Sequence, residues 1–153
     1  MPTSNIAHSV WLKRREALRV IAGSAAGTAV ASGAPTPGAE VPKQVSIALA
    51  DMMLLQKIYG IYFNEGANGW EQIKREAEPL LVTAAGGYAG LKASEAILAE
   101  VLNWVPGVGW LISGTITGTV TGGLGATWWW ACDQAYRKHT SPVQQLQAAW
   151  QAV

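Results

Sequence analysis

The sequence predicts an all-α fold, a small helical bundle that contains a Gly-rich hydrophobic helical hairpin. Three observations favour it. Beyond Val45, apolar residues recur at three- and four-residue steps along much of the chain. The segment from Val101 to Cys132 carries no charge and has regularly spaced glycines. The chain has 153 residues, 50% of them apolar and 14% charged, which fits one domain with a tail.

Residues 1–40 differ in composition from the rest and are expected to form a signal-like or anchor-like segment, or a disordered one. A basic stretch precedes an uncharged run of small residues, as in an export signal. The pair Arg14 and Arg15 resembles the paired arginines of a twin-arginine signal. Ala29 and Ala31 fit the small residues of a cleavage site, so cleavage is expected directly after Ala31.

An uncleaved signal would instead anchor the chain, because residues 20–38 are near the minimum length for a membrane span. Pro35 and Pro37 are expected to break any helix before the body begins. The body is predicted to be a helical domain over residues 41–140. A short C-terminal docking helix is expected over residues 141–153.

The first expected helix of the body starts at Val45 and stops at Gly60. Its apolar residues repeat at helical steps: Val45, Leu49, Met52, Met53 and Tyr59. The other side carries polar residues: Gln44, Asp51 and Lys57. A second helix is expected after the cap Asn68, with Glu71 completing a capping box. A third is expected over residues 88–103.

The uncharged run contains Gly114, Gly118 and Gly122 at strict four-residue spacing, with Ala126 next in line. On a helix these residues form a groove along which another helix can approach closely. Residues 110–131 would make about 33 Å of helix, enough to cross a bilayer core. The glycine face is therefore the expected helix-packing site.

Tryptophans flank this run, with Trp110 near one end and Trp128, Trp129 and Trp130 near the other. Interfacial aromatic residues belong at such positions. Consecutive helical residues point about 100° apart, so the three tryptophans form a collar, for membrane anchoring or for a flat hydrophobic ligand. Two alternatives remain open for the run: a helix buried in a soluble bundle, or a strand over residues 115–121.

A corner of Pro106, Gly107 and Gly109 precedes the Gly/Thr-rich run, and the pair Tyr59-Gly60 precedes the corner. In this order and spacing the motifs resemble the uncharacterised helical membrane-associated domain found C-terminal to GTPase domains in some bacterial proteins. The resemblance covers about residues 49–138. It implies a membrane location and a helical architecture, and it implies no chemistry.

Two departures from that family limit what the resemblance implies. The chain has no GTPase domain and no phosphate-binding Gly-x-x-x-x-Gly-Lys-Ser/Thr sequence, so no nucleotide is expected. It also carries the apparent export signal, which members fused to cytosolic GTPases would not need.

The composition leaves little material for catalysis. One Cys excludes a disulfide framework and a thiolate metal cage, and two His leave little for a His-based metal site. Glu71 and Glu78 share a solvated helix face rather than a cleft. Cys132 and His139 lie two turns apart, about 10 Å along a helix, which is too far for a nucleophile and its base. We expect no enzyme, no metal and no cofactor.

These observations predict a non-enzymatic membrane-associated protein that acts through Gly-zipper helix packing with itself or with a partner membrane protein. The expected location is the bacterial inner membrane, with export to its periplasmic side as a variant. Membrane lipid is an expected partner, whereas a net charge of +1 gives no basic field for nucleic acid. Two alternatives are an accessory or hydrophobic-ligand-binding subunit of a larger membrane complex, and a secreted pore-forming or bacteriocin-like protein.

Overall fold

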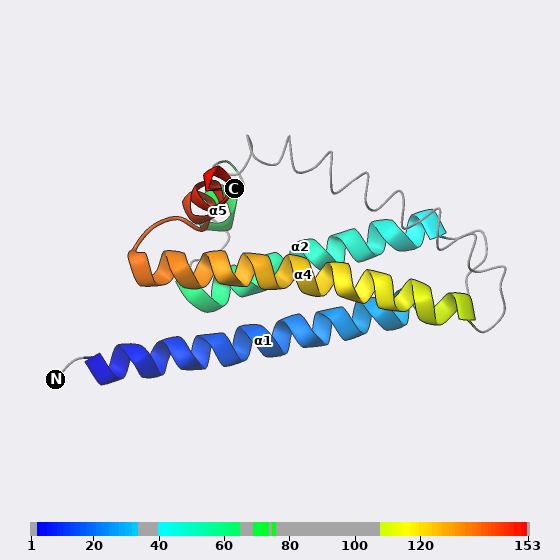
Figure 1. Cartoon of the computed structure of the whole chain (residues 1–153), viewed down its shortest axis with the longest axis horizontal. Coiled ribbons are helices and arrows are strands. Elements are labelled where there is room, and N and C mark those ends of the chain that lie inside the picture. Colours follow the sequence, from blue (N-terminus) through cyan, green and yellow to red (C-terminus); the bar gives the residue numbers. More distant parts are fainter. Residues whose placement is uncertain (1–2, 34–39, 65–68, 74, 76–107, 153) are drawn as a thin grey trace.

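Helical periodicity and the absence of interior prolines produce three long helices, which pack side by side in a computed structural model (Figure 1). They are α1 (Thr3–Gly33), α2 (Glu40–Phe63) and α4 (Val108–Lys138), and α1 runs antiparallel to the other two. The structure describes residues 3–33, 40–64, 69–73, 75 and 108–152. No strand occurs within these ranges, so the predicted all-α bundle is confirmed and the strand alternative for residues 115–121 is wrong.

Helix α1 replaces the disordered tail that was one alternative for the N-terminal segment. Its buried residues recur at helical steps along one stripe: Val10, Ala17, Ile21 and Thr28. This stripe packs mainly against α4 and also contacts α2. Residues 3–33 are therefore an integral part of the bundle. The expected break at Pro35 and Pro37 lies outside the described residues.

The sequence predicted that this helix stops at Gly60, but α2 continues to Phe63. The residue that ends it is Asn64, which has a left-handed φ of 49°. Its N–H donates to the carbonyl of Gly60 at 3.0 Å, a common way to close a helix. The extra turn buries Tyr62, and this packing outweighs the low helix propensity of glycine.

Helix α4 extends beyond the expected residues 110–131 at both ends. It closes at His139, whose φ is 55°, while the N–H of Thr140 donates to the carbonyl of Ala135 at 3.0 Å. Ser141 then caps α5 (Pro142–Gln151) through a capping box with Gln144. Helix α5 packs on α4, near the end where the chain of α1 begins (Figure 1).

Two different kinds of packing hold the long helices together. Near the C-terminal ends of α2 and α4 lies an apolar core, whose large members include Leu54, Ile58, Tyr62 and Trp128. Toward the other end the helices meet through small and polar residues: Thr28, Asp51, Thr117, Gly118 and Thr121. We call these two parts the core half and the small-residue half.

Several expected features lie outside the described residues. The predicted helix over residues 88–103 and the corner residues Pro106 and Gly107 belong to this group, whereas Gly109 lies in the first turn of α4. Residues 69–73 are helical, as expected for the segment after Asn68.

Candidate functional site

The glycine face of α4 lies against α1. A Cβ atom on Gly118 would come within 2.9 Å of the Ala29 Cβ and 3.1 Å of the Ala25 carbonyl oxygen, so only glycine fits there without a shift. A Cβ on Gly122 would lie 3.7 Å from the Ala25 Cβ, an ordinary contact. Gly114 lies one turn earlier in the same helix. The close partner of this face is thus α1 of the same chain.

Sequence reasoning missed the third close position of this interface. It placed Ala126 next in the glycine row, but Ala126 is exposed, and Gly125 faces inward instead. A Cβ on Gly125 would lie 3.1 Å from both Ile21 Cγ1 and Leu54 Cδ2. A strict four-residue row drifts around a helix of 3.6 residues per turn, so the contact moves to a three-residue step.

The interior of the small-residue half contains a carboxylate. Asp51 is 1% exposed, and the hydroxyl of the fully buried Thr121 donates to its Oδ1 at 2.8 Å. Thr28, also buried, donates to the carbonyl of Ser24 in its own helix at 3.0 Å. Buried polar groups in this half thus have hydrogen-bond partners, Asp51 in another helix and Thr28 in its own.

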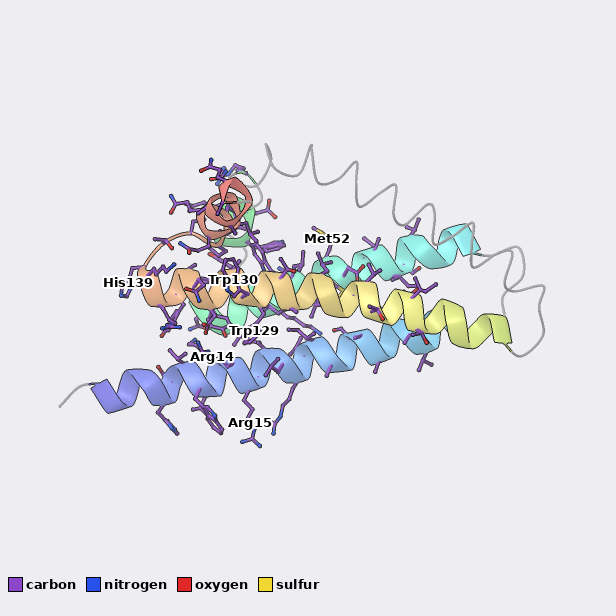
Figure 2. All side chains as sticks on the ribbon, viewed as in Figure 1. Arg14, Arg15, Met52, Trp129, Trp130 and His139 are labelled. Atoms are coloured by element: carbon purple, nitrogen blue, oxygen red, sulfur yellow. The ribbon has the colours of Figure 1, made fainter. Side chains whose placement is uncertain are left out.

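Part of the apolar surface of α2 faces outward in the same half, although Ile47, Leu54 and Ile58 of the same helix are buried. Four large residues on it are exposed: Val45, Leu49, Met52 and Met53. Leu49 is 62% and Met53 57% exposed, and Figure 2 shows Met52 pointing away from the rest of the bundle. Only Tyr59 of the predicted apolar side is buried, where its ring lies 6.0 Å from that of Trp70. We call the four exposed residues the α2 stripe.

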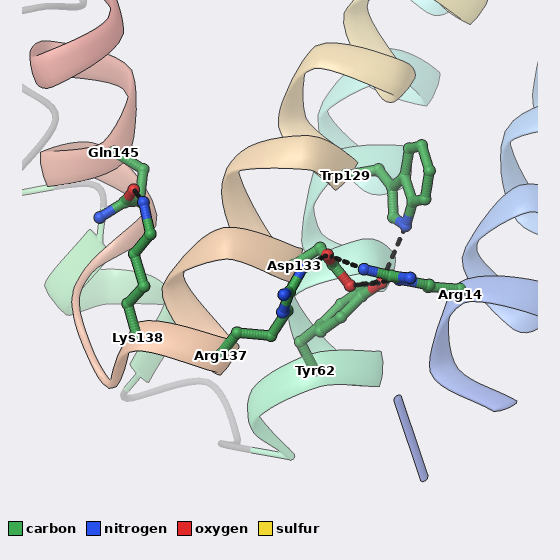
Figure 3. Close-up of polar contacts among 7 residues, drawn as sticks. All are labelled: Arg14, Tyr62, Trp129, Asp133, Arg137, Lys138 and Gln145. Carbon is green, nitrogen blue, oxygen red and sulfur yellow. Dashed lines mark hydrogen bonds and ion pairs between the residues drawn. The ribbon is translucent and has the colours of Figure 1, made fainter. Parts of the chain in front are cut away.

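Charged residues meet at the other end of the bundle, where Arg14 of α1 binds Asp133 of α4 (Figure 3). The guanidinium donates through Nε to Oδ1 at 2.8 Å and through Nη2 to Oδ2 at 2.6 Å, a bidentate pair. The hydrogen bond to Asp133 raises the pKa of Arg14 above its ordinary value. The pair joins residues that are 119 positions apart in sequence.

Tyr62 extends this pair into a chain of hydrogen bonds. Its hydroxyl donates to Asp133 Oδ1 at 3.3 Å and accepts from Trp129 Nε1 at 2.8 Å. Arg137 stands at the edge of the network, with Nη1 4.0 Å from Asp133 Oδ2. All three long helices contribute to this network, so it fixes their positions relative to one another.

Lys13 supports the end of α2. Its ammonium donates to the carbonyls of Ile61 and Tyr62, at 3.2 Å for the latter, and lies 5.1 Å from the ring centroid of Tyr136. The last carbonyls of a helix have no partner within the helix and carry partial negative charge. The ammonium group of Lys13 donates hydrogen bonds to these carbonyls, and its positive charge offsets their partial negative charge.

The two arginines of the predicted targeting motif have different environments. Arg14 points toward α4, whereas Arg15 points away from the bundle and lies 5.4 Å from the Trp11 ring (Figure 2). Ala29 contacts Gly118, and Ala31 lies exposed two residues further on. Cleavage after Ala31 would therefore detach a helix that supplies an ion pair and a close-packed interface.

The three consecutive tryptophans point in different directions. Trp128 is buried and donates to the carbonyl of Leu55 at 2.9 Å, Trp129 binds Tyr62, and Trp130 is 41% exposed. They line no common wall, in line with the 100° step of a helix. The surroundings of the Trp110 side chain lie outside the described part of the structure.

The one cysteine lies in the core half. Cys132 has no exposed surface, and burial raises the pKa of its thiol, which disfavours the nucleophilic thiolate. His139 is exposed at the end of α4. Among the residues that the structure describes, no group of three His, Cys, Asp or Glu residues is arranged to hold a metal ion.

One helix of the described chain, Val45–Phe63, is long and apolar enough to cross a membrane, with a mean hydropathy of 1.2 over its 19 residues. A core helix of a soluble protein meets the same criterion, so the direction of its side chains is the more informative observation. No protein-family model, curated protein or solved structure matches this chain.

Proposed function

We propose that this chain is a non-enzymatic, membrane-embedded helical protein of a bacterial inner membrane, with its small-residue half in the bilayer. In this proposal α1 is an uncleaved anchor, and helix packing between α1 and α4 is the structural basis of the embedded part.

The observation that carries the proposal is the exposed α2 stripe, which lies opposite a buried carboxylate. Asp51 is buried against Thr121, while Leu49 and Met53 on the opposite side are more than half exposed. In water, leaving such apolar side chains exposed is unfavourable, because burying one of them is worth about 1.5–3 kcal/mol. In lipid, ionisable groups turn toward the bundle interior and apolar groups cover the outside.

The distribution of charge along the bundle also supports the proposal. Helix α1 is uncharged from Val20 onward, and α4 is uncharged before Asp133. Most charged side chains of the three long helices gather in the core half: Lys13, Arg14, Arg15, Glu16, Arg19, Lys57, Asp133, Arg137 and Lys138. Bases outnumber acids there, which is typical of the cytoplasmic side of a membrane protein.

The glycine face supports packing by small residues. Without a hydrophobic driving force between them, helices in lipid associate where small side chains let backbones approach. Gly118 meets Ala25 and Ala29 in this way. Because α1 of the same chain occupies the glycine face, that face does not serve as a contact with a second copy. We propose that lipid covers the outward α2 stripe.

An alkaline carbonate wash of membranes tests the proposal. Wild-type protein is expected to stay in the membrane pellet. Leu49→Lys places a charge in the α2 stripe and is expected to shift the protein toward the soluble fraction. The control Gln56→Lys places the same charge at an exposed position beside Lys57 and is expected to behave as wild type.

Circular dichroism in detergent checks that both variants keep their helical content. Complete release of folded wild-type protein by carbonate would overturn the proposal. Equal retention of the Leu49 and Gln56 variants would show that lipid does not cover the α2 stripe.

A further inference from the structure

A groove of about 980 Å³ opens at the charged end of the bundle. Three helices form it: the first part of α1, the last turn of α2 and the end of α4. The residues that matter for its chemistry are Trp11, Arg14, Phe63, Tyr136, Arg137 and His139. None of the described residues that line it is acidic.

The bases around the groove exceed the negative charge that faces them. Asp133 engages Arg14 through both carboxylate oxygens, and it lies 4.0 Å from Arg137. One carboxylate thus serves two guanidinium groups, and the Arg137 side chain is 54% exposed. Lys13 adds a further charge beside the Tyr136 wall. The groove therefore attracts an anion, and Arg137 has donors free to turn toward it.

The walls of the groove are aromatic. Trp11 is 52% exposed at one side, and Phe63 and Tyr136 stack edge to face at 6.3 Å on the other. A free inorganic phosphate would use the bases and leave these walls in contact with water. A ligand with an anionic group attached to apolar chains would bind the bases and also pack against the aromatic walls.

We propose that this groove binds the headgroup of an anionic phospholipid, with the phosphodiester at Arg137 and His139 and the glycerol against Trp11 and Tyr136. The proposal rests on the proposed membrane location. Arg14 lies about 9 Å of helix beyond Val20, where the uncharged part of α1 begins. A headgroup layer extends about 5–8 Å beyond the hydrocarbon core, so the groove opens at the outer edge of that layer.

Isothermal titration calorimetry of the full-length protein in a non-ionic detergent tests this. The three titrants are dihexanoyl phosphatidylglycerol, dihexanoyl phosphatidylcholine and sodium phosphate. We expect phosphatidylglycerol to bind about tenfold more tightly than phosphatidylcholine, and sodium phosphate not to compete at equal concentration.

Two variants and a matched control assign the binding to the groove. Arg137→Gln is expected to weaken phosphatidylglycerol binding about fivefold and phosphatidylcholine binding less, because the choline ammonium of phosphatidylcholine already offsets the attraction of its phosphodiester to the bases. Trp11→Ala removes an exposed wall without opening the core and is expected to weaken binding of both lipids. The control Lys138→Gln removes the neighbouring base, which bonds Gln145 at 3.1 Å outside the groove, and is expected to stay within about twofold of wild type.

Equal affinity for the two lipids would overturn the proposal, and so would equal losses in the Arg137 and Lys138 variants. Competition by sodium phosphate at equal concentration would identify a free-phosphate site instead. Because the titration uses detergent and short-chain lipid, it stands apart from the carbonate wash. A protein retained in membranes without lipid preference would refute only the groove, whereas a carbonate-released protein with the preference would refute only the embedded location.

Discussion

The contact between α1 and α4 is tested most directly by a Gly118→Ala substitution. The added methyl would lie 2.9 Å from the Ala29 Cβ and 3.1 Å from a backbone oxygen of Ala25, neither of which is the end of a flexible side chain. Such overpacking costs about 1–3 kcal/mol, and replacing glycine by alanine within a helix returns about 1 kcal/mol. The free energy of unfolding is therefore expected to fall by about 1 kcal/mol.

Gly123→Ala is the matched control on the same helix. A Cβ atom at Gly123 meets nothing within 4 Å, so only the gain in helix propensity of about 1 kcal/mol remains. The two variants thus change stability in opposite directions and differ by about 2 kcal/mol. For a chain of this size the difference corresponds to about 4–8 °C in Tm.

Thermal unfolding followed by circular dichroism, in detergent and at equal protein concentration, measures both variants. The expected order of Tm is the Gly123 variant above wild type and wild type above the Gly118 variant. If Gly118→Ala raises the Tm as much as Gly123→Ala does, α1 does not approach α4 at this point and the reasoning is refuted.

Two further predictions concern the core half. Arg14→Gln is expected to lower the free energy of unfolding by about 2 kcal/mol, less than for a fully buried pair because the Arg14 side chain is 40% exposed, whereas Arg15→Gln changes it little; equal Tm values would contradict the role of the ion pair. Cys132 is expected to resist maleimide in the folded protein and to react after denaturation, since its thiol is buried and its pKa is raised; rapid labelling of the native protein, followed by mass spectrometry, would contradict this burial.

Local sequence patterns predicted α2 and α4 as helices, but they did not predict that α1 is a helix of the bundle. The glycine row predicted a close approach, and Gly118 lies at one; the helix over residues 110–131 was expected and is part of α4. The ends of the helices were less predictable. Helix α2, for example, continues beyond Gly60 because this buries Tyr62. Such an effect depends on residues distant in sequence and leaves no local pattern.

Which side of α2 faces the other helices was not predictable from the sequence. An amphipathic pattern shows that Asp51 and Leu49 lie on different sides, but it does not say which side faces other helices. The Arg14–Asp133 pair gave no signal either, because each residue has an ordinary local environment in the sequence. Arg14 instead matched a targeting motif together with Arg15, although only Arg14 takes part in the ion pair.

The long separation between Arg14 and Asp133 has a consequence for synthesis of the chain. Because the pair spans 119 residues, a ribosome adding about 5–20 residues per second needs about 6–24 s to make Asp133 after Arg14. During much of that interval α1 lacks its main partner, and its buried stripe and its bases are available to other molecules. A nascent chain that stalls before Val108 would keep α1 in this state, whereas an extension after Val153 would leave the order of pairing unchanged.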